Sequence, residues 1–146
     1  MNGRPFPTLL LVAALGFSTG ACGGDELINP ADLAGSYALL EVNGGQLPAV
    51  IASDVESVTR VVSGALTLEE DRDYLIAISL RTSFGDDIEL PGSFDDRGIY
   101  ILRDRSLFFA STSADTTWVG SVDGSTVAVA LALEGGEPTL QLRFVR

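Results

Sequence analysis

Strict alternation of apolar with polar or small side chains is the feature that most limits what this chain can fold into. It occurs in residues 72–82, 125–133 and 139–146. The apolar positions that share one parity are Tyr74, Ile76, Ile78 and Leu80, then Val127, Val129, Leu131 and Leu133, then Leu140, Leu142 and Phe144. Successive side chains of a strand point to opposite faces, so a period of two predicts strands with one buried face.

Turn-forming sequences separate the apolar segments. They are Asn-Gly-Gly at 43–45, Phe-Gly-Asp at 84–86, Asp-Asp-Arg-Gly at 95–98, Asp-Gly at 123–124 and Gly-Gly at 135–136. Such sequences favour tight turns between antiparallel strands, and the one helical turn is expected near residues 29–33. The fold class that we predict is all-β, an antiparallel up-and-down meander of eight or nine strands. We expect it to close into a roughly eight-stranded barrel rather than a two-sheet sandwich, because closure removes exposed strand edges.

The amino end has the pattern of a secretory signal peptide. Arg4 precedes an apolar stretch at 9–17, small residues follow at 18–21, and no acidic residue occurs before Asp25. The apolar stretch has about half of the roughly 20 residues that a membrane-spanning helix needs. We therefore expect residues 1–21 to be removed, residues 22–33 to be a tether and residues 34–146 to be the barrel domain.

Cys22 is the only cysteine and directly follows this stretch. It has no intramolecular disulfide partner, and the chain has no histidine or second cysteine to make it a metal-binding or activated thiol. Residues 19–22 (Thr-Gly-Ala-Cys) resemble a bacterial lipobox, which implies a lipoprotein whose Cys22 carries fatty-acyl chains such as palmitate and anchors the chain in the cell envelope. Gly23 follows the cysteine, which by the same resemblance favours the outer membrane where the organism has two.

Charge and residue inventory limit partners and chemistry. The net charge of −11 becomes −12 without residues 1–21, which contain Arg4 and no acid, so binding to nucleic acid or to an anionic membrane surface is disfavoured. Without histidine or lysine there is no serine–histidine triad, histidine-ligated zinc or lysine Schiff base. Aspartate pairs at 71/73, 86/87 and 95/96 suit turns better than a calcium loop. We expect no enzyme activity, no cofactor and no metal.

The start of the domain, GSYALLEVNGGQLP, resembles the opening of lipocalin-like domains of bacterial lipoproteins. Gly35-Ser36-Tyr37 stands where lipocalins have Gly-X-Trp, and Arg143 or Arg146 stands near the arginine of their closing strand. Closure of the meander predicts that strand 35–42 pairs with strand 139–145, and the resemblance implies that an arginine stacks on Tyr37. Arg143 is the expected partner, because Arg146 is terminal.

Two function classes remain open, a lipid-anchored barrel that binds a small apolar ligand and a non-catalytic envelope interaction or structural module with a filled core. We favour ligand binding, with protein partners unknown. The candidate lumen residues are Tyr37, Tyr74, Ile76, Ile78, Leu80, Trp118, Val129, Leu131 and Leu142. Each of these is equally consistent with an ordinary core position, and Trp118 in particular suits the end of a packed core.

Overall fold

Ten strands and one short helix make up most of the computed structural model, which describes residues 28–85, 88–132 and 139–146. The elements are α1 (Pro30–Leu33), β1 (Gly35–Val42), β2 (Gly45–Gln46), β3 (Ala49–Ser53), β4 (Ser57–Leu68), β5 (Asp73–Phe84), β6 (Ile88–Arg103), β7 (Ser106–Ser111), β8 (Thr117–Asp123), β9 (Thr126–Ala132) and β10 (Thr139–Val145). The signal-peptide, tether and lipobox predictions for residues 1–27 lie outside the described residues, as do Asp86 and the turn at 135–136.

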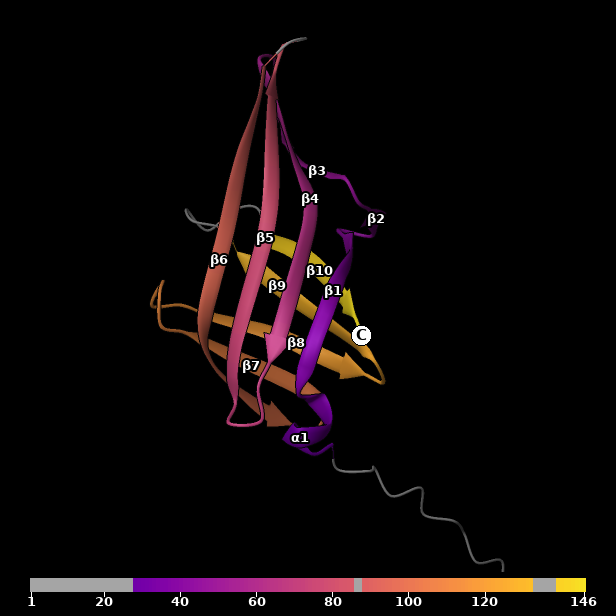
Figure 1. The fold of residues 1–146 in the computed structure, drawn as a ribbon, viewed down its shortest axis with the longest axis vertical. Helices are drawn as coiled ribbons and strands as arrows, with labels where there is room; N and C mark the ends of the chain where they lie inside the picture. The colour runs from indigo at the N-terminus through magenta and orange to yellow at the C-terminus, as the bar shows by residue number, and fades with distance from the viewer. Residues whose placement is uncertain (1–27, 86–87, 133–138) are drawn as a thin grey trace, which may run out of the picture.

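Eight of the strands close into an antiparallel barrel (Figure 1). Strands β4 to β10 each pair with the next along the chain, β10 pairs with β1, and β1 pairs with β4. The pairing of the first with the last strand runs from Ala38 opposite Val145 to Val42 opposite Leu142. The predicted all-β, eight-stranded closed meander is therefore confirmed, with β2 and β3 as two additional strands.

Three strands continue beyond the closed part of the barrel. β1 pairs only with residues 65–68 of β4, and β7 pairs only with residues 98–103 of β6. The far half of β5 pairs with those of β4 and β6, β4 also pairs with β3, and the three long strands rise well past the shorter strands β7 to β10 (Figure 1). We call residues 57–61 of β4, 80–84 of β5 and 88–94 of β6 the extension. Closure therefore protects the edges of the closed part, whereas in the extension β3 covers the edge of β4 and the edge of β6 has no partner among the described strands.

Large side chains fill the closed part. Tyr37, Tyr100, Phe109 and Phe144 are all fully buried, and Phe109 packs against the rings of Tyr74 (5.0 Å between centroids, edge-on) and Tyr100 (6.4 Å). Truncating a buried aromatic residue costs about 3–5 kcal/mol, so these rings contribute much of the stability of the closed part.

The turn predicted at residues 95–98 is wrong, because these residues lie inside the 16-residue strand β6. Gly98 is needed there for a different reason than a turn. A Cβ on Gly98 would lie 1.9 Å from the carbonyl oxygen of Ala110, so only glycine allows β7 to approach β6 this closely. The glycine marks a close crossing of two backbones, which sequence alone does not distinguish from a turn signal.

The helical turn expected near residues 29–33 is confirmed as α1. Asn29 caps it by accepting a hydrogen bond from the Ala31 amide (3.1 Å), and Pro30 occupies the first helical position, where its missing N–H is tolerated. Leu33 is buried, and its carbonyl accepts a hydrogen bond from the Tyr37 hydroxyl (2.7 Å). The helix lies at the end of the barrel opposite the extension (Figure 1), so we call this the basal end.

Candidate functional site

The sequence-predicted lumen residues all lie on the inward parity of their strands, but they fall in two environments. Eight of them are buried: Tyr37, Tyr74, Ile76, Ile78, Trp118, Val129, Leu131 and Leu142. Leu80 is only partly buried, at the point where β5 leaves the closed part. The buried eight belong to one continuous apolar cluster, so in this structure they pack against other side chains.

A buried carboxylate lies among these apolar residues. Asp96 is 2% exposed and is the only buried charged residue in the described part of the chain. It accepts hydrogen bonds from four side chains: Tyr74 Oη (2.6 Å), Trp118 Nε1 (2.7 Å), Ser111 Oγ (2.5 Å) and Ser113 Oγ (2.9 Å). Tyr74 belongs to β5, Ser111 to the end of β7, Ser113 to the β7–β8 connection and Trp118 to β8, so Asp96 joins four segments to β6.

Two opposing effects set the pKa of Asp96. Burial raises the pKa of this carboxyl, and the hydrogen bonds from Ser111, Tyr74, Trp118 and Ser113 together lower it by more, which leaves it below its usual value. Burial and the neighbouring carboxylate raise the pKa of Tyr74 well above that of a free tyrosine. Asp96 is therefore an anion whose carboxylate accepts hydrogen bonds from all four of these side chains, and its lowered pKa makes it a weak base.

Sequence reasoning missed this role, because it treated Asp95 and Asp96 as turn residues. One signal could have revealed it. Asp96 has the same parity as Phe94 and Tyr100, so once β6 is read as one strand, a carboxylate falls on an otherwise apolar face. A charge at such a position needs hydrogen-bonding partners inside the barrel.

Trp118 and Phe94 lie at the boundary between the closed part and the extension. Their rings meet edge-on with centroids 6.4 Å apart, and the indole N–H of Trp118 donates a hydrogen bond to Asp96. Trp118 is 4% exposed, whereas Phe94 is partly buried. We call this pair the floor, because the inner face of the extension begins beyond it.

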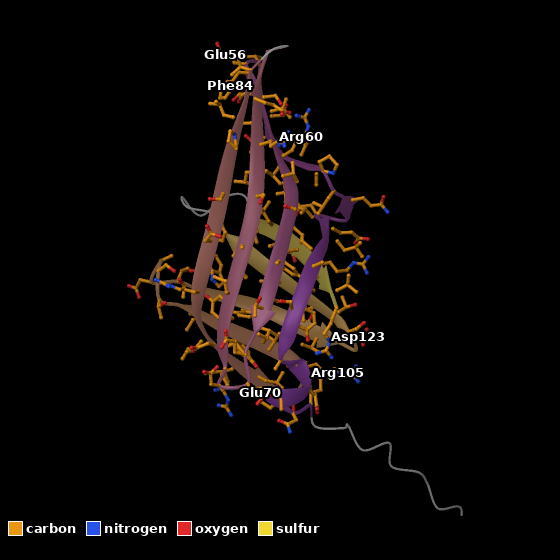
Figure 2. All side chains as sticks on the ribbon, viewed as in Figure 1. Glu56, Arg60, Glu70, Phe84, Arg105 and Asp123 are labelled. Carbon is orange, nitrogen blue, oxygen red and sulfur yellow. The ribbon has the colours of Figure 1, made fainter. Side chains whose placement is uncertain are left out.

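Beyond the floor, the inner face of the extension is apolar and largely uncovered. The β5–β6 register places Leu80 opposite Gly92, Thr82 opposite Leu90 and Phe84 opposite Ile88, without irregularity. The inward parity of Ile76 and Asp96 therefore continues to Phe84, Leu90 and Ile88, which are 40%, 53% and 58% exposed. Phe84 lies near the tip in Figure 2.

The opposite face of the extension is polar. Arg81 forms an ion pair with Glu89 (2.9 Å), and Arg60 Nη1 donates to Ser83 Oγ (3.0 Å). On the inner face, the only side-chain hydrogen bond between described residues of the extension joins the hydroxyls of Thr59 and Thr82 (3.0 Å). The extension is thus an amphipathic sheet, and within the part of the chain that the structure describes Phe84, Ile88 and Leu90 stay exposed on its apolar, inward side.

The arginine at the barrel seam is not the one expected. Arg146, not Arg143, lies over the Tyr37 ring, with its guanidinium carbon 5.5 Å from the ring centroid. Parity is the reason: Leu142 and Phe144 point inward, so Arg143 points outward, where it forms a bidentate ion pair with Glu41. Arg146 also donates to the carbonyls of Ala34 (3.1 Å) and Asp32 (3.2 Å), which fixes the carboxyl end of the chain against the basal end.

The described part of the chain contains no helix long and apolar enough to cross a membrane, and no group of three or more potential metal-ligating side chains. Comparison of the chain with known protein families and with curated protein sequences gave no match.

Proposed function

We propose that this protein is a lipid-anchored, non-catalytic lipoprotein of the cell envelope whose barrel binds a small apolar ligand on the inner face of the extension. The observation that carries the ligand site is the exposure of Phe84, Ile88 and Leu90 on the inward side of the sheet, continuous with Leu80 and the floor. Small-molecule sites are lined mainly by apolar side chains with few polar groups, and the inner face of the extension shares this composition.

The positions of the two ends of the barrel are compatible with anchoring through Cys22. The described chain begins at Ile28, beside α1 at the basal end, while the extension lies at the other end (Figure 1). An anchor at Cys22 would therefore leave the inner face of the extension pointing away from the membrane, accessible to a ligand. The two or more acyl chains of a lipoprotein would contribute about 0.8 kcal/mol for each buried methylene.

The size and charge of the face limit the ligand. Three strands spaced by about 4.8 Å and five residues of about 3.3 Å each give a face of about 240 Å². Covering it removes a similar area of the ligand from water, so the two apolar surfaces together would contribute on the order of 12 kcal/mol. An association cost of about 4 kcal/mol would leave about 8 kcal/mol, which corresponds to an affinity of about 1 μM. The net charge of −11 disfavours anionic ligands, so the ligand class that we propose is a neutral or cationic apolar molecule.

One observation favours the alternative, an envelope interaction or structural module. The large side chains that fill the closed part leave its buried residues packed against one another rather than around a ligand. In this alternative the barrel would be a rigid support, and a protein rather than a small molecule would contact its surface.

Titration with the neutral apolar fluorophore N-phenyl-1-naphthylamine tests ligand binding. Trp118 is the only tryptophan, so energy transfer from it reports a probe bound near the floor. Leu90→Asn should weaken binding at least fivefold. Val119→Asn is the matched control, since Val119 is 52% exposed but has the outward parity of its strand, and it should stay within twofold of wild type. Non-saturable binding, or equal weakening by both variants, would refute the ligand site and leave the interaction module.

A further inference from the structure

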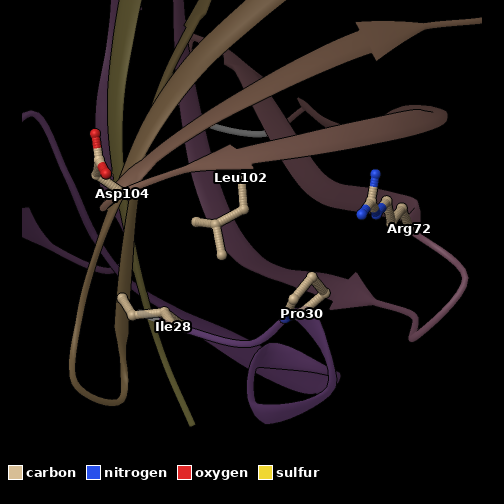
Figure 3. Close-up of a pocket in the computed structure, with 5 residues that line it drawn as sticks. All are labelled: Ile28, Pro30, Arg72, Leu102 and Asp104. Carbon is tan, nitrogen blue, oxygen red and sulfur yellow. The ribbon is translucent and has the colours of Figure 1, made fainter. Parts of the chain in front are cut away.

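A small pocket at the basal end combines two opposite charges with an apolar wall (Figure 3). It has a volume of about 190 Å³ and is lined by Ile28, Pro30, Arg72, Leu102 and Asp104. Arg72 belongs to the turn between β4 and β5, and Asp104 belongs to the turn between β6 and β7. Figure 3 shows their charged groups on opposite sides, with Leu102 and Pro30 between them.

The two charges do not form an ion pair with each other. The ion pairs found within residues 28–85, 88–132 and 139–146 are Arg81–Glu89 and Arg143–Glu41, so Arg72 and Asp104 are more than 4 Å from each other. The backbone of Arg72 is fixed by hydrogen bonds from its amide to the Glu69 carbonyl (3.1 Å) and from the Tyr100 amide to its own carbonyl (2.8 Å). A ligand that contacts both side chains therefore needs an anionic and a cationic group that are separated from each other.

The pocket also lies where the chain enters the fold. Ile28 and Pro30, two of its lining residues, follow Cys22 by only six and eight positions. Six residues span at most about 20 Å when fully extended. If Cys22 is acylated, the pocket is thus within about 20 Å of the membrane surface, close enough to meet lipid headgroups.

We propose that this basal pocket binds the zwitterionic headgroup of a membrane phospholipid. Arg72 would donate to the phosphate oxygens, for which a guanidinium has the matching fork of donors, and Asp104 would accept from the ammonium group. Leu102, Ile28 and Pro30 would contact the methylenes between them. The site would orient the barrel upright on its membrane, with the extension pointing outward. This inference rests on the lipid anchoring proposed above, not on the apolar ligand.

Weak affinity is sufficient for such a site. Exposed ion pairs contribute little individually, so a free headgroup should bind with a dissociation constant in the millimolar range. A tether of a few residues holds the pocket at an effective headgroup concentration of the same order, which makes binding intramolecular. A purely anionic headgroup lacks the group that Asp104 would accept from, and the acidic chain repels it.

Amide NMR titration of residues 22–146 carrying Cys22→Ser, which have no acyl chain, tests the site. Glycerophosphoethanolamine should shift the resonances of Arg72 and Asp104 saturably, and glycerol phosphate or ethanolamine alone should bind at least fivefold more weakly. Arg72→Gln and Asp104→Asn should each weaken binding at least fivefold. Arg105→Gln and Asp123→Asn remove the same charges from exposed positions outside the pocket lining and should have less than a twofold effect.

Vesicles distinguish a lipid from a free solute of the same chemistry. Phosphatidylethanolamine vesicles should broaden the resonances of the basal end, and phosphatidylglycerol vesicles should not. Binding of the free headgroup without binding to vesicles would overturn the proposal that the ligand is a lipid. If glycerol phosphate binds as tightly as glycerophosphoethanolamine and still binds the Asp104→Asn variant, the proposal that the pocket recognises a zwitterion is overturned. Because the measurement needs no acyl chain and no apolar ligand, its failure is distinct from failure of the anchor or of the extension site.

Discussion

Replacing Asp96 by alanine should destabilise the barrel through the donors that it leaves behind. The Tyr74 hydroxyl and the Trp118 indole N–H are both buried and both donate to Asp96. A buried donor without a partner costs about 1–3 kcal/mol, so the two together give about 2–6 kcal/mol. Ser111 and Ser113 are less buried and can turn to water, so they add little.

A double-mutant cycle separates lost hydrogen bonds from lost packing. Tyr74→Phe alone should destabilise the protein by about 1–2 kcal/mol, but in the Asp96→Ala background it removes an unsatisfied donor and should cost close to nothing. Asp95→Ala is the control, because Asp95 is exposed on the outward parity of the same strand. Urea unfolding should be followed by far-UV circular dichroism, since the mutation itself alters the surroundings of Trp118.

The dependence of stability on pH gives an independent check of the same carboxylate. The pKa of Asp96 is lower in the folded than in the unfolded protein, so its contribution is fully present above its unfolded pKa of about 4. The contribution is then lost as the pH falls through the lower, folded pKa. Wild type should therefore lose more stability than Asp96→Ala below about pH 4. An Asp96→Ala variant within 1 kcal/mol of wild type at pH 7 would refute the reasoning.

The remaining predictions concern the seam and the anchor. Tyr37→Ala should cost about 3–5 kcal/mol in urea melts, the range for a buried aromatic residue. Arg146→Ala should remove a cation–π contact of about 0.5–1 kcal/mol and lower the melting midpoint more than Arg143→Ala, whose side chain lies on the outer surface; the reverse order would contradict the assignment. Deletion of residues 139–146 should abolish cooperative unfolding, because the closing strand is lost. Cys22→Ser should release the protein from salt-washed membranes, and continued sedimentation would contradict acylation.

The closed part of the barrel was predictable because period-two alternation is a local signal. Every second side chain is buried in β9, in β10 and in the part of β5 that belongs to the closed barrel, as the sequence indicated. The same parity rule assigns Phe144 inward and Arg143 outward. Applied one step further, it would have placed Arg146 on the side of Phe144. A terminal residue is expected to fray, but the hydrogen bonds from Arg146 to the carbonyls of Ala34 and Asp32 hold it in place.

The extension and the role of Asp96 were not predictable in the same way. The sequence Asp-Asp-Arg-Gly has the composition of a turn, and only the approach of β7 to Gly98 shows that it lies within a strand. A turn predicted at residues 95–98 divides β6 into two short strands. The length of β6 and the inward parity of Asp96 then cannot be recognised from the sequence. The extension depends on where β1 and β7 stop pairing with their neighbours, which is a long-range property of the assembled barrel.

Native mass spectrometry of the protein, purified gently from its own membrane, tests the central claim most directly. The claim is that the inner face of the extension holds a small apolar molecule. We expect wild type and Val119→Asn to carry a bound neutral or cationic apolar molecule in addition to the mass of the chain. We expect Leu90→Asn, expressed and purified alongside them, to have lost it. Wild type that carries no such molecule, or Leu90→Asn that retains it at the same occupancy, would contradict the claim.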